Sequence, residues 1–139
     1  MKNPNNPKER NLVKGAIRRI FSRSELRSLA LARNLINHKD STRPRVSRWA
    51  FCESCGIIEA AYTMEVDHKE PVVPIDKPFE SMNWDEFVDR LWCDIKGLQI
   101  LCEECHNEKS KEENKKRKEN KDARTKNGGS VPKNRARKK

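Results

Sequence analysis

The chain has 139 residues, of which 34% are hydrophobic and 37% charged, so it can form one domain with only a modest core. It shows no secretory signal peptide and no apolar run near the roughly 18 residues of a membrane span, which argues against a membrane protein and leads us to expect a cytoplasmic location. In that reducing compartment the five cysteines are expected to bind metal rather than to form disulfides.

Charge falls into three blocks along the chain. Residues 1–48 carry 13 Lys/Arg and 3 Asp/Glu, residues 49–108 carry 4 and 14, and residues 109–139 carry 14 and 4, so a centre of net −10 lies between two arms of net +10 each. Basic arms are typical of proteins that bind a polyanion such as DNA, whereas a carboxylate-rich centre suits metal cations. The C-terminal arm could alternatively serve solubility alone.

Residues 1–48 are predicted to form a basic helical N-terminal region. Apolar residues recur at helical spacing over residues 12–21, with most of the basic residues off that stripe. Ser22 and Glu25 have the spacing of a capping box for a second helix, which is predicted to end near Asn37.

Residues 49–120 are predicted to form the main domain. Alternation of apolar and polar residues over residues 60–67 predicts a strand, and the apolar segment 98–101 predicts another. Between them lie a proline-rich loop and a short helix over residues 84–92, with Asn83 placed as its N-cap. The predicted fold class is therefore α+β.

A last helix is predicted to run from Glu103 through the basic tail, supported by oppositely charged pairs four residues apart such as Glu112 and Lys116. Gly128 and the glycine after it are expected to end this helix. Residues 121–139 as a whole are assigned to a basic, disordered tail.

Four of the five cysteines form two Cys-x-x-Cys segments, made of Cys52, Cys55, Cys102 and Cys105. Two such pairs in a small chain are typical of a tetrahedral zinc site with four thiolate ligands. Four thiolates leave no open coordination position, so this zinc is predicted to be structural. Cys93 has no partner in this scheme and is expected to be a small core residue.

A second metal site is suggested by Asp67, His68 and His106. His106 directly follows Cys105, and because neighbouring helical side chains project about 100° apart, it can face a different site from the zinc. Asp67 and His68 come at the end of the predicted strand. Taken singly, each of the three could also be a solvated strand-end, loop or surface residue.

The segments FCESCG, EVDHKEPV and GLQILCEECHNEKS, in this order, resemble the HNH endonucleases. The ββα-metal motif of that family has Cys-x-x-Cys, then Asp-His near a proline, then Leu-Cys-x-x-Cys-His-x-x-Lys. The tract WDEFVDRLWC is similar to small HNH proteins encoded by bacteriophages. The resemblance covers roughly residues 49–119, and residues 1–48 match only loosely.

The resemblance implies a small zinc-stapled ββα-metal core and a one-metal phosphodiesterase. By match to the family's positions, Asp67 and His106 would bind a divalent cation, namely Mg²⁺, Mn²⁺ or another transition metal. His68 would be the general base that activates water, and Lys109 would steady a phosphate.

The sequence departs from the family's pattern at two positions. Gly97 stands where an asparagine usually precedes the second strand, which raises the question of how that loop is held. Lys69 stands where an apolar residue is common. One geometric condition also follows: because adjacent strand residues face opposite sides, Asp67 and His68 can share a site only if the strand ends or twists there.

The expected function is a DNA endonuclease that leaves 5′-phosphate and 3′-hydroxyl ends. Phosphate contacts are expected from basic residues beside and beyond the metal motifs, namely Lys69, Lys111, Lys115, Lys116, Arg117 and Lys118. One alternative is a non-catalytic, zinc-stapled nucleic-acid-binding protein. Another is the nuclease subunit of a phage DNA-packaging machine in a bacterial host, with packaging proteins docked on the N-terminal helices.

Overall fold

The computed structural model describes residues 6–128, and it has the predicted α+β fold. The helices are α1 (Pro7–Phe21), α2 (Glu25–Arg33), α3 (Trp84–Leu91) and α4 (Glu103–Asn127). One antiparallel sheet has the order β1-β2-β3, and the other pairs β4 with β5. These strands are Leu35–Ile36, Trp49–Phe51, Ile58–Ala60, Glu65–His68 and Leu98–Leu101.

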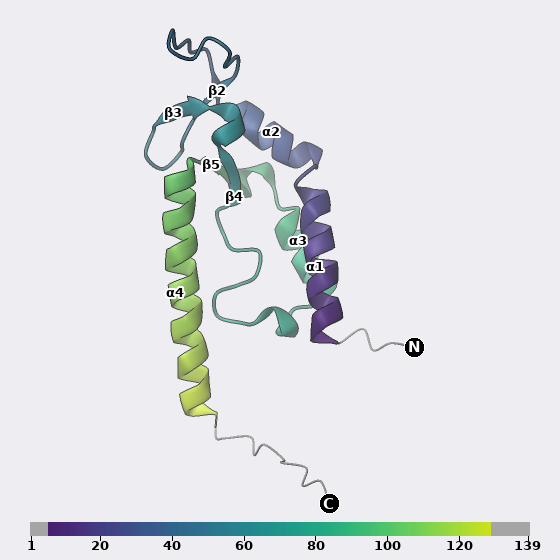
Figure 1. Ribbon diagram of the computed structural model, residues 1–139. Helices are drawn as coiled ribbons and strands as arrows, with labels where there is room; N and C mark the ends of the chain where they lie inside the picture. Colours follow the sequence, from purple (N-terminus) through teal and green to yellow (C-terminus); the bar gives the residue numbers. More distant parts are fainter. Residues whose placement is uncertain (1–5, 129–139) are drawn as a thin grey trace, which may run out of the picture.

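Figure 1 shows the two sheets at one end of the molecule and two long helices, α1 and α4, extending from that end. The connection between β4 and α3 runs between them. Strand β4, strand β5 and α4 therefore form a β-β-α unit, in which α4 begins two residues after β5 ends.

The core lies between β5, α2 and α3. Its largest fully buried side chains include Phe87, Leu91, Leu98 and Ile100. Leu98 and Ile100 share one face of β5, as the two-residue period of a strand requires. Each such side chain contributes about 1.5–3 kcal/mol by leaving water, so this small cluster supplies much of the domain's stability.

Cationic side chains attach α1 to the core, besides the buried Phe21 at its end. The guanidinium of Arg10 lies 5.0 Å from the ring centroid of Phe79 and 4.7 Å from that of Trp84. It also donates a hydrogen bond of 2.9 Å to the carbonyl of Met82. Much of the predicted apolar stripe stays exposed, since Leu12 is 71% accessible to solvent.

The second helix ends earlier than predicted. Helix α2 stops at Arg33, and Leu35–Ile36 form β1 beside β2 instead of a last helical turn. The predicted cap was also wrong: the side chain of Ser24 accepts from the backbone N–H of Arg27, whereas Ser22 follows the last turn of α1. Apolar spacing alone continues across this break, so the sequence pattern did not reveal it.

The predicted strand over residues 60–67 is split by a 3₁₀ turn at Ala61–Thr63. Strand β3 before the turn pairs with β2, and β4 after it pairs with β5. The turn thus carries the chain from one sheet to the other. The helix over residues 84–92 and the strand over residues 98–101 are confirmed, including Asn83 as the N-cap of α3.

Helix α4 has no buried residue, and side-chain donors hold it to the loop after β4. Arg117 donates to the carbonyls of Val73 at 2.6 Å and Pro74 at 3.0 Å. Further along, Asn120 and Arg124 donate to the next two carbonyls of the same loop. The part-buried bonds from the charged Arg117 contribute about 1.5–3 kcal/mol each, which helps to explain how so polar a helix stays in place.

The predicted end of the last helix is confirmed, since α4 reaches Asn127 and Gly128 is its C-cap. Residues 121–127 of the segment assigned to the tail are therefore helical, and residues 129–139 lie outside the described part of the chain. Between residues 6 and 128, no helix has the length and apolar character needed to cross a membrane.

The cap assignment predicts different effects for two nearby serines. Ser24→Ala should lower the free energy of unfolding by about 1 kcal/mol, because an N–H of the first turn of α2 loses its partner. Ser22→Ala should have a smaller effect, since its exposed hydroxyl bonds only the carbonyl of Arg19. Urea denaturation of the two variants measures this, and a larger loss for Ser22→Ala would contradict the assignment.

Candidate functional site

Four cysteine thiols form a compact cluster at the sheet end of the molecule. The sulfur atoms of Cys52, Cys55, Cys102 and Cys105 all lie within 4.8 Å of one another, and those of Cys55 and Cys102 are 3.8 Å apart. Four sulfurs bound tetrahedrally at about 2.3 Å from a zinc ion would be about 3.8 Å apart. The predicted cluster is confirmed, and it could hold a metal ion such as zinc.

Local backbone geometry presents the thiols of each pair together. Gly56, with φ of 76°, turns the chain after the first pair, and its N–H donates to the carbonyl of Cys52. The second pair occupies the start of α4, with Cys102 at the N-cap. Burial raises the pKa of Cys52, but hydrogen bonds from the backbone of Cys55, Cys102 and Ser54 outweigh it and lower this pKa to about 6.

Hydrogen bonds join the first cysteine pair to β5. The N–H of Glu53 donates to the carbonyl of Ile100 at 2.8 Å, and the Glu53 carboxylate accepts from the N–H of Ile100. The two Cys-x-x-Cys segments are thus brought together by the backbone as well as by any bound ion.

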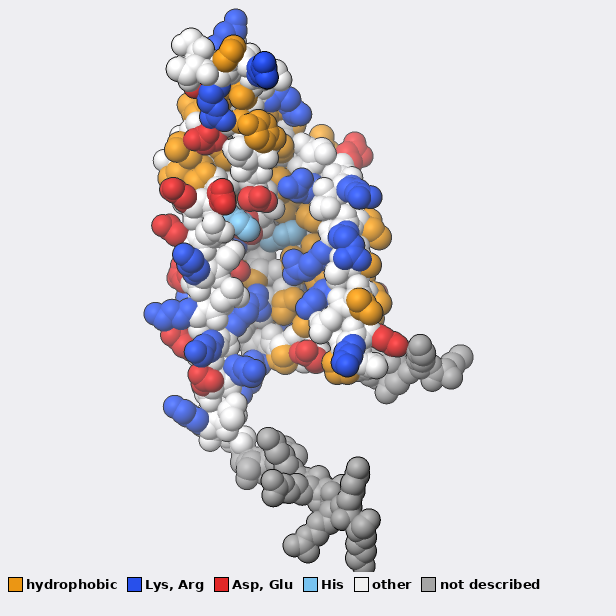
Figure 2. Space-filling view, in the orientation of Figure 1, with side chains coloured by type: hydrophobic (Ala, Val, Ile, Leu, Met, Phe, Trp, Pro, Cys, Tyr) orange, Lys and Arg blue, Asp and Glu red, His pale blue; other side chains and the backbone are white. Residues whose placement is uncertain are grey.

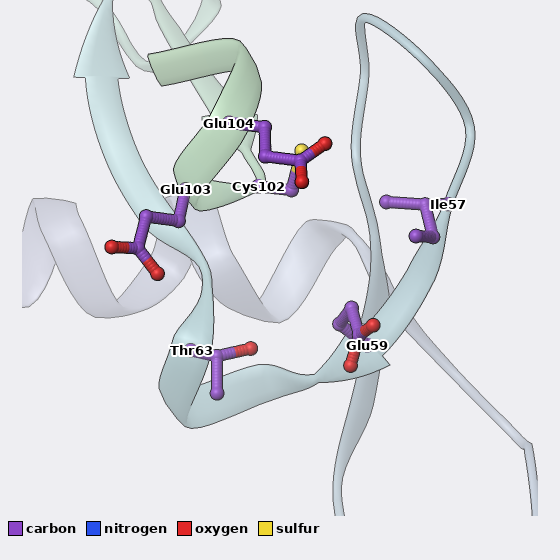
Figure 3. Close-up of a pocket in the computed structure, with 6 residues that line it drawn as sticks. All are labelled: Ile57, Glu59, Thr63, Cys102, Glu103 and Glu104. Carbon is purple, nitrogen blue, oxygen red and sulfur yellow. The ribbon is translucent and has the colours of Figure 1, made fainter. Parts of the chain in front are cut away.

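Beside this cluster lies an acidic hollow of about 280 Å³ (Figure 3). Glu59, Glu103 and Glu104 line it, and Glu59 forms a 3.0 Å ion pair with Arg43. Glu103 and Glu104 stand in the first turn of α4, where negative charge stabilises the helix. These carboxylates have structural roles and would repel a phosphate.

A second cleft, of about 190 Å³, brings together Asp67, His68, His106 and Lys109. The closest carboxylate oxygen of Asp67 lies 3.9 Å from Nε2 of His106. Figure 2 shows histidine side chains at the sheet end of the hollow between α4 and α1. The residues singled out for the second site therefore lie in one place, supplied by β4 and α4.

The imidazole of His68 is oriented by a main-chain carbonyl. Its Nε2 lies 2.8 Å from the oxygen of Leu91, and its ring centroid is 5.1 Å from that of Phe21. Because a carbonyl only accepts, Nε2 carries a proton, and the neutral ring keeps Nδ1 free to accept another. Burial lowers the pKa of His68, so the ring is neutral at neutral pH.

The end of β4 explains how neighbouring residues share this cleft. Asp67 is paired with Gln99, whose side-chain amide donates to the Asp67 carboxylate at 3.0 Å. This carboxylate faces α4, where it meets His106 and Lys109. His68 is the last residue of the strand, and its ring turns toward Phe21 and Leu91. Both side chains still line the cleft, as the sequence condition required.

Asp67 and His106 lie close enough together that both could reach one cation. Two ligand bonds of about 2.1 Å each span at most about 4.2 Å, which exceeds the 3.9 Å between the Asp67 oxygen and His106 Nε2. Among the described residues, the cysteine cluster is the only group of three or more His, Cys, Asp or Glu side chains close enough to hold one ion. Asp67 and His106 therefore have no third ligand of these types beside them. A cation held by these two residues would keep most of its coordination positions for water or phosphate oxygens.

Lys109 is not free to bind a phosphate in this structure. Its ammonium contacts the Asp67 carboxylate at 2.9 Å, the carbonyl of His68 at 2.9 Å and the carboxylate of Glu113 at 2.5 Å. An ammonium has three donors, so all are engaged. Desolvation disfavours the charged form, but the Glu113 and Asp67 bonds outweigh it and raise the pKa of Lys109. Lys109 therefore orders Asp67 and the end of β4.

The residues predicted to contact phosphate lie on different surfaces of the molecule. Arg117 lines the cleft, whereas Lys116 pairs with Glu112 at 2.8 Å. Lys69 lines another hollow, next to Gly97, and the remaining predicted contacts of α4 are exposed on a different face of the helix: Lys111, Lys115 and Lys118.

Among the residues that sequence reasoning missed, two polar ones matter most for the chemistry of the cleft. Arg18 of α1 lines the cleft, and Gln99 bonds Asp67. The only sequence signal for Arg18 was its position off the apolar stripe, and for Gln99 its alternation with Leu98 and Ile100.

Gly97 is explained by the packing of Cys93. A Cβ at Gly97 would lie 2.8 Å from the sulfur of Cys93, and the carbonyl of Gly97 accepts from the N–H of Lys69 at 2.8 Å. The loop before β5 is therefore held through the backbone without an asparagine. Cys93 is half-buried and packs against the core, as expected.

No family model matches the chain, and comparisons with curated proteins and with solved structures find no match either. The cysteine cluster and the cleft of Asp67, His68 and His106 are therefore the observations that bear on function.

The cysteine cluster predicts that the purified protein carries one zinc and that Cys55→Ser loses it. Since Cys55 is exposed, the substitution removes little packing, and a fall in melting temperature of roughly 10 °C or more would report lost metal binding. Metal content and thermal unfolding are measured together, with Cys93→Ser as the control that keeps the zinc. Full zinc retention in Cys55→Ser would contradict the site.

The contact at Gly97 predicts a rescue. Gly97→Ala should destabilise the protein by about 1–3 kcal/mol through overpacking against Cys93. Cys93→Ala removes the sulfur, so Gly97→Ala should cost clearly less in that background, a coupling that urea denaturation of the four proteins measures. Equal costs in both backgrounds would show that this contact does not require the glycine.

Proposed function

We propose that the chain is a metal-dependent DNA endonuclease of the HNH type, which hydrolyses phosphodiester bonds with His68 as general base. The observation that carries this proposal is the shared cleft of Asp67, His68 and His106, in which a main-chain carbonyl leaves Nδ1 of His68 free to accept a proton.

The cysteine cluster has a structural part in this proposal. Four thiolates would close the coordination shell of zinc and leave no position for substrate. The ion would tie the turn after β2 to the first turn of α4, and so fix His106, one residue beyond Cys105, opposite Asp67.

Asp67 and His106 would hold a second divalent cation, Mg²⁺, Mn²⁺ or another transition metal. When bound, this ion supplies Lewis-acid charge that stabilises the leaving 3′ oxygen. Nδ1 of His68 takes the proton of a water molecule as the water oxygen attacks phosphorus. The bond between phosphorus and the 3′ oxygen breaks, and this oxygen receives a proton from solvent, leaving 5′-phosphate and 3′-hydroxyl ends.

The distribution of charge favours DNA as the substrate. The acidic hollow lies beside the cysteine cluster, whereas Arg18 and Arg117 line the cleft of the proposed reaction. Phosphate contacts from α1 and α4 would make binding strongly dependent on salt and only weakly dependent on sequence.

Two observations favour related alternatives. The ion pair of Lys109 with Asp67 would suit a silent centre, in which the chain is a zinc-stapled nucleic-acid-binding protein. The exposed Leu12 and Ile20 of α1, 71% and 64% accessible, would suit docking of a partner, as in a nuclease subunit of a phage packaging machine.

The test is cleavage of supercoiled plasmid by zinc-loaded protein, with and without Mg²⁺ or Mn²⁺. Relaxed or linear DNA should form only with added metal, and His68→Ala should lower the rate about 100-fold or more, because the proton acceptor is lost. His38→Ala is the matched control, since that ring packs on Trp49 outside the cleft.

The wild type, His68→Ala and His38→Ala must carry equal amounts of zinc, which shows that all three proteins are folded. Plasmid that stays intact with every metal, while DNA is still retarded on a gel, would overturn the nuclease and support the silent binder. Equal cleavage by His68→Ala and wild type would overturn the assigned base.

A further inference from the structure

Helix α1 directs one basic side chain, that of Arg18, at the proposed reaction cleft. Arg18 lines it together with Asp67 and His68, and Lys14 lies one helical turn earlier on the same side of α1. Arg117 of α4 lines the same cleft. Figure 2 shows Lys and Arg side chains along both sides of the hollow between the two helices.

Aromatic rings of the core fix where these two α1 cations lie. The guanidinium carbon of Arg18 is 5.8 Å from the ring centroid of Phe87, and the ammonium of Lys14 is 4.4 Å from that of Phe79. Phe87 is fully buried and Phe79 nearly so. Both cations are therefore held against a rigid surface, although Arg18 stays accessible to solvent.

The charge of Arg18 is not balanced by the protein. Within residues 6–128 its side chain forms no ion pair and no hydrogen bond, and the carboxylates of Asp67 and Glu113 in the same cleft are engaged by Lys109. Partial desolvation, and then the charge of Arg117, lower the pKa of Arg18. An arginine stays protonated even so, and these like charges repel unless an anion lies between them.

Arg117 cannot replace Arg18 in that role. Its guanidinium already donates to the carbonyls of Val73 and Pro74, which fixes its position and uses part of its donors. Arg18 has all five donors free, in a planar arrangement that matches two oxygens of a phosphate.

We propose that Arg18 binds a phosphate of the nucleic-acid strand beside His68. The identity of the anion rests on the proposed function. The basic region of residues 1–48, which lies outside the resemblance to HNH nucleases, thereby supplies part of the substrate site. This also gives α1 a role beyond packing on the core.

The test compares Arg18→Gln with Arg19→Gln. Arg19 is the next residue, is exposed, and lines a different hollow with Ile20 and Trp92, so each substitution removes one charge from almost the same position. Binding of a fluorescein-labelled DNA duplex is followed by anisotropy at several salt concentrations, without divalent metal and in a His68→Ala background. Plasmid cleavage is followed in the background with His68 intact.

Arg18→Gln should weaken binding and reduce the salt slope by about one unit more than Arg19→Gln does. Its cleavage should fall roughly 10- to 100-fold, because a donor to the reacting strand is lost. Arg18→Lys should keep the salt slope but cleave several-fold more slowly, since an ammonium cannot bind two oxygens in the same fork. Equal slopes and equal cleavage for Arg18→Gln and Arg19→Gln would overturn the proposal.

The binding measurement separates this inference from the proposed function. If the protein with Arg18 and Arg19 intact binds DNA in the His68→Ala background, and the protein with His68 intact does not cut it, the nuclease proposal fails. A slope reduced only by Arg18→Gln would then still support the phosphate contact. Failure of the protein with both arginines intact to bind DNA at low salt would overturn both. Circular dichroism of each variant shows that the fold is kept.

Discussion

The four-cysteine cluster is the constraint on which the arrangement of this small protein depends. It joins the turn after β2 to the first turn of α4, two segments about fifty residues apart in the chain. Because His106 follows Cys105 directly, the same helical turn that offers a thiol to the cluster also offers an imidazole to the neighbouring cleft. With only a modest core, a metal ion held by these four thiols would fix where α4 begins and which way it points.

A second set of contacts positions the other side of the cleft. The carbonyl of Leu91, at the end of α3, fixes the ring of His68, and Phe21, at the end of α1, packs against that ring. Lys109 and Gln99 hold the Asp67 carboxylate. The chemical groups are thus held by elements from the whole described chain, which a short motif alone would not provide.

Charge is segregated in space as well as along the sequence. The carboxylates near the cysteine cluster line one hollow, and cations of α1 and α4 meet at another. A polyanion would be repelled at the first and attracted at the second. Helix α4 contributes to both hollows. Its first turn is acidic, and a later turn carries Arg117, whose guanidinium donates to carbonyls of the loop after β4.

The sequence by itself determined the α+β class, the grouping of four cysteines in one cluster, and most helices and strands. It also identified the candidate site residues. These features depend on local spacing and periodicity. Tertiary structure decided what local patterns do not encode: the split of the 60–67 strand, the pairing of β1, the packing of Cys93 on Gly97 and the engagement of Lys109. Above all it decided that Arg18 lines the cleft, since only the packing of α1 on a distant core brings that side chain there.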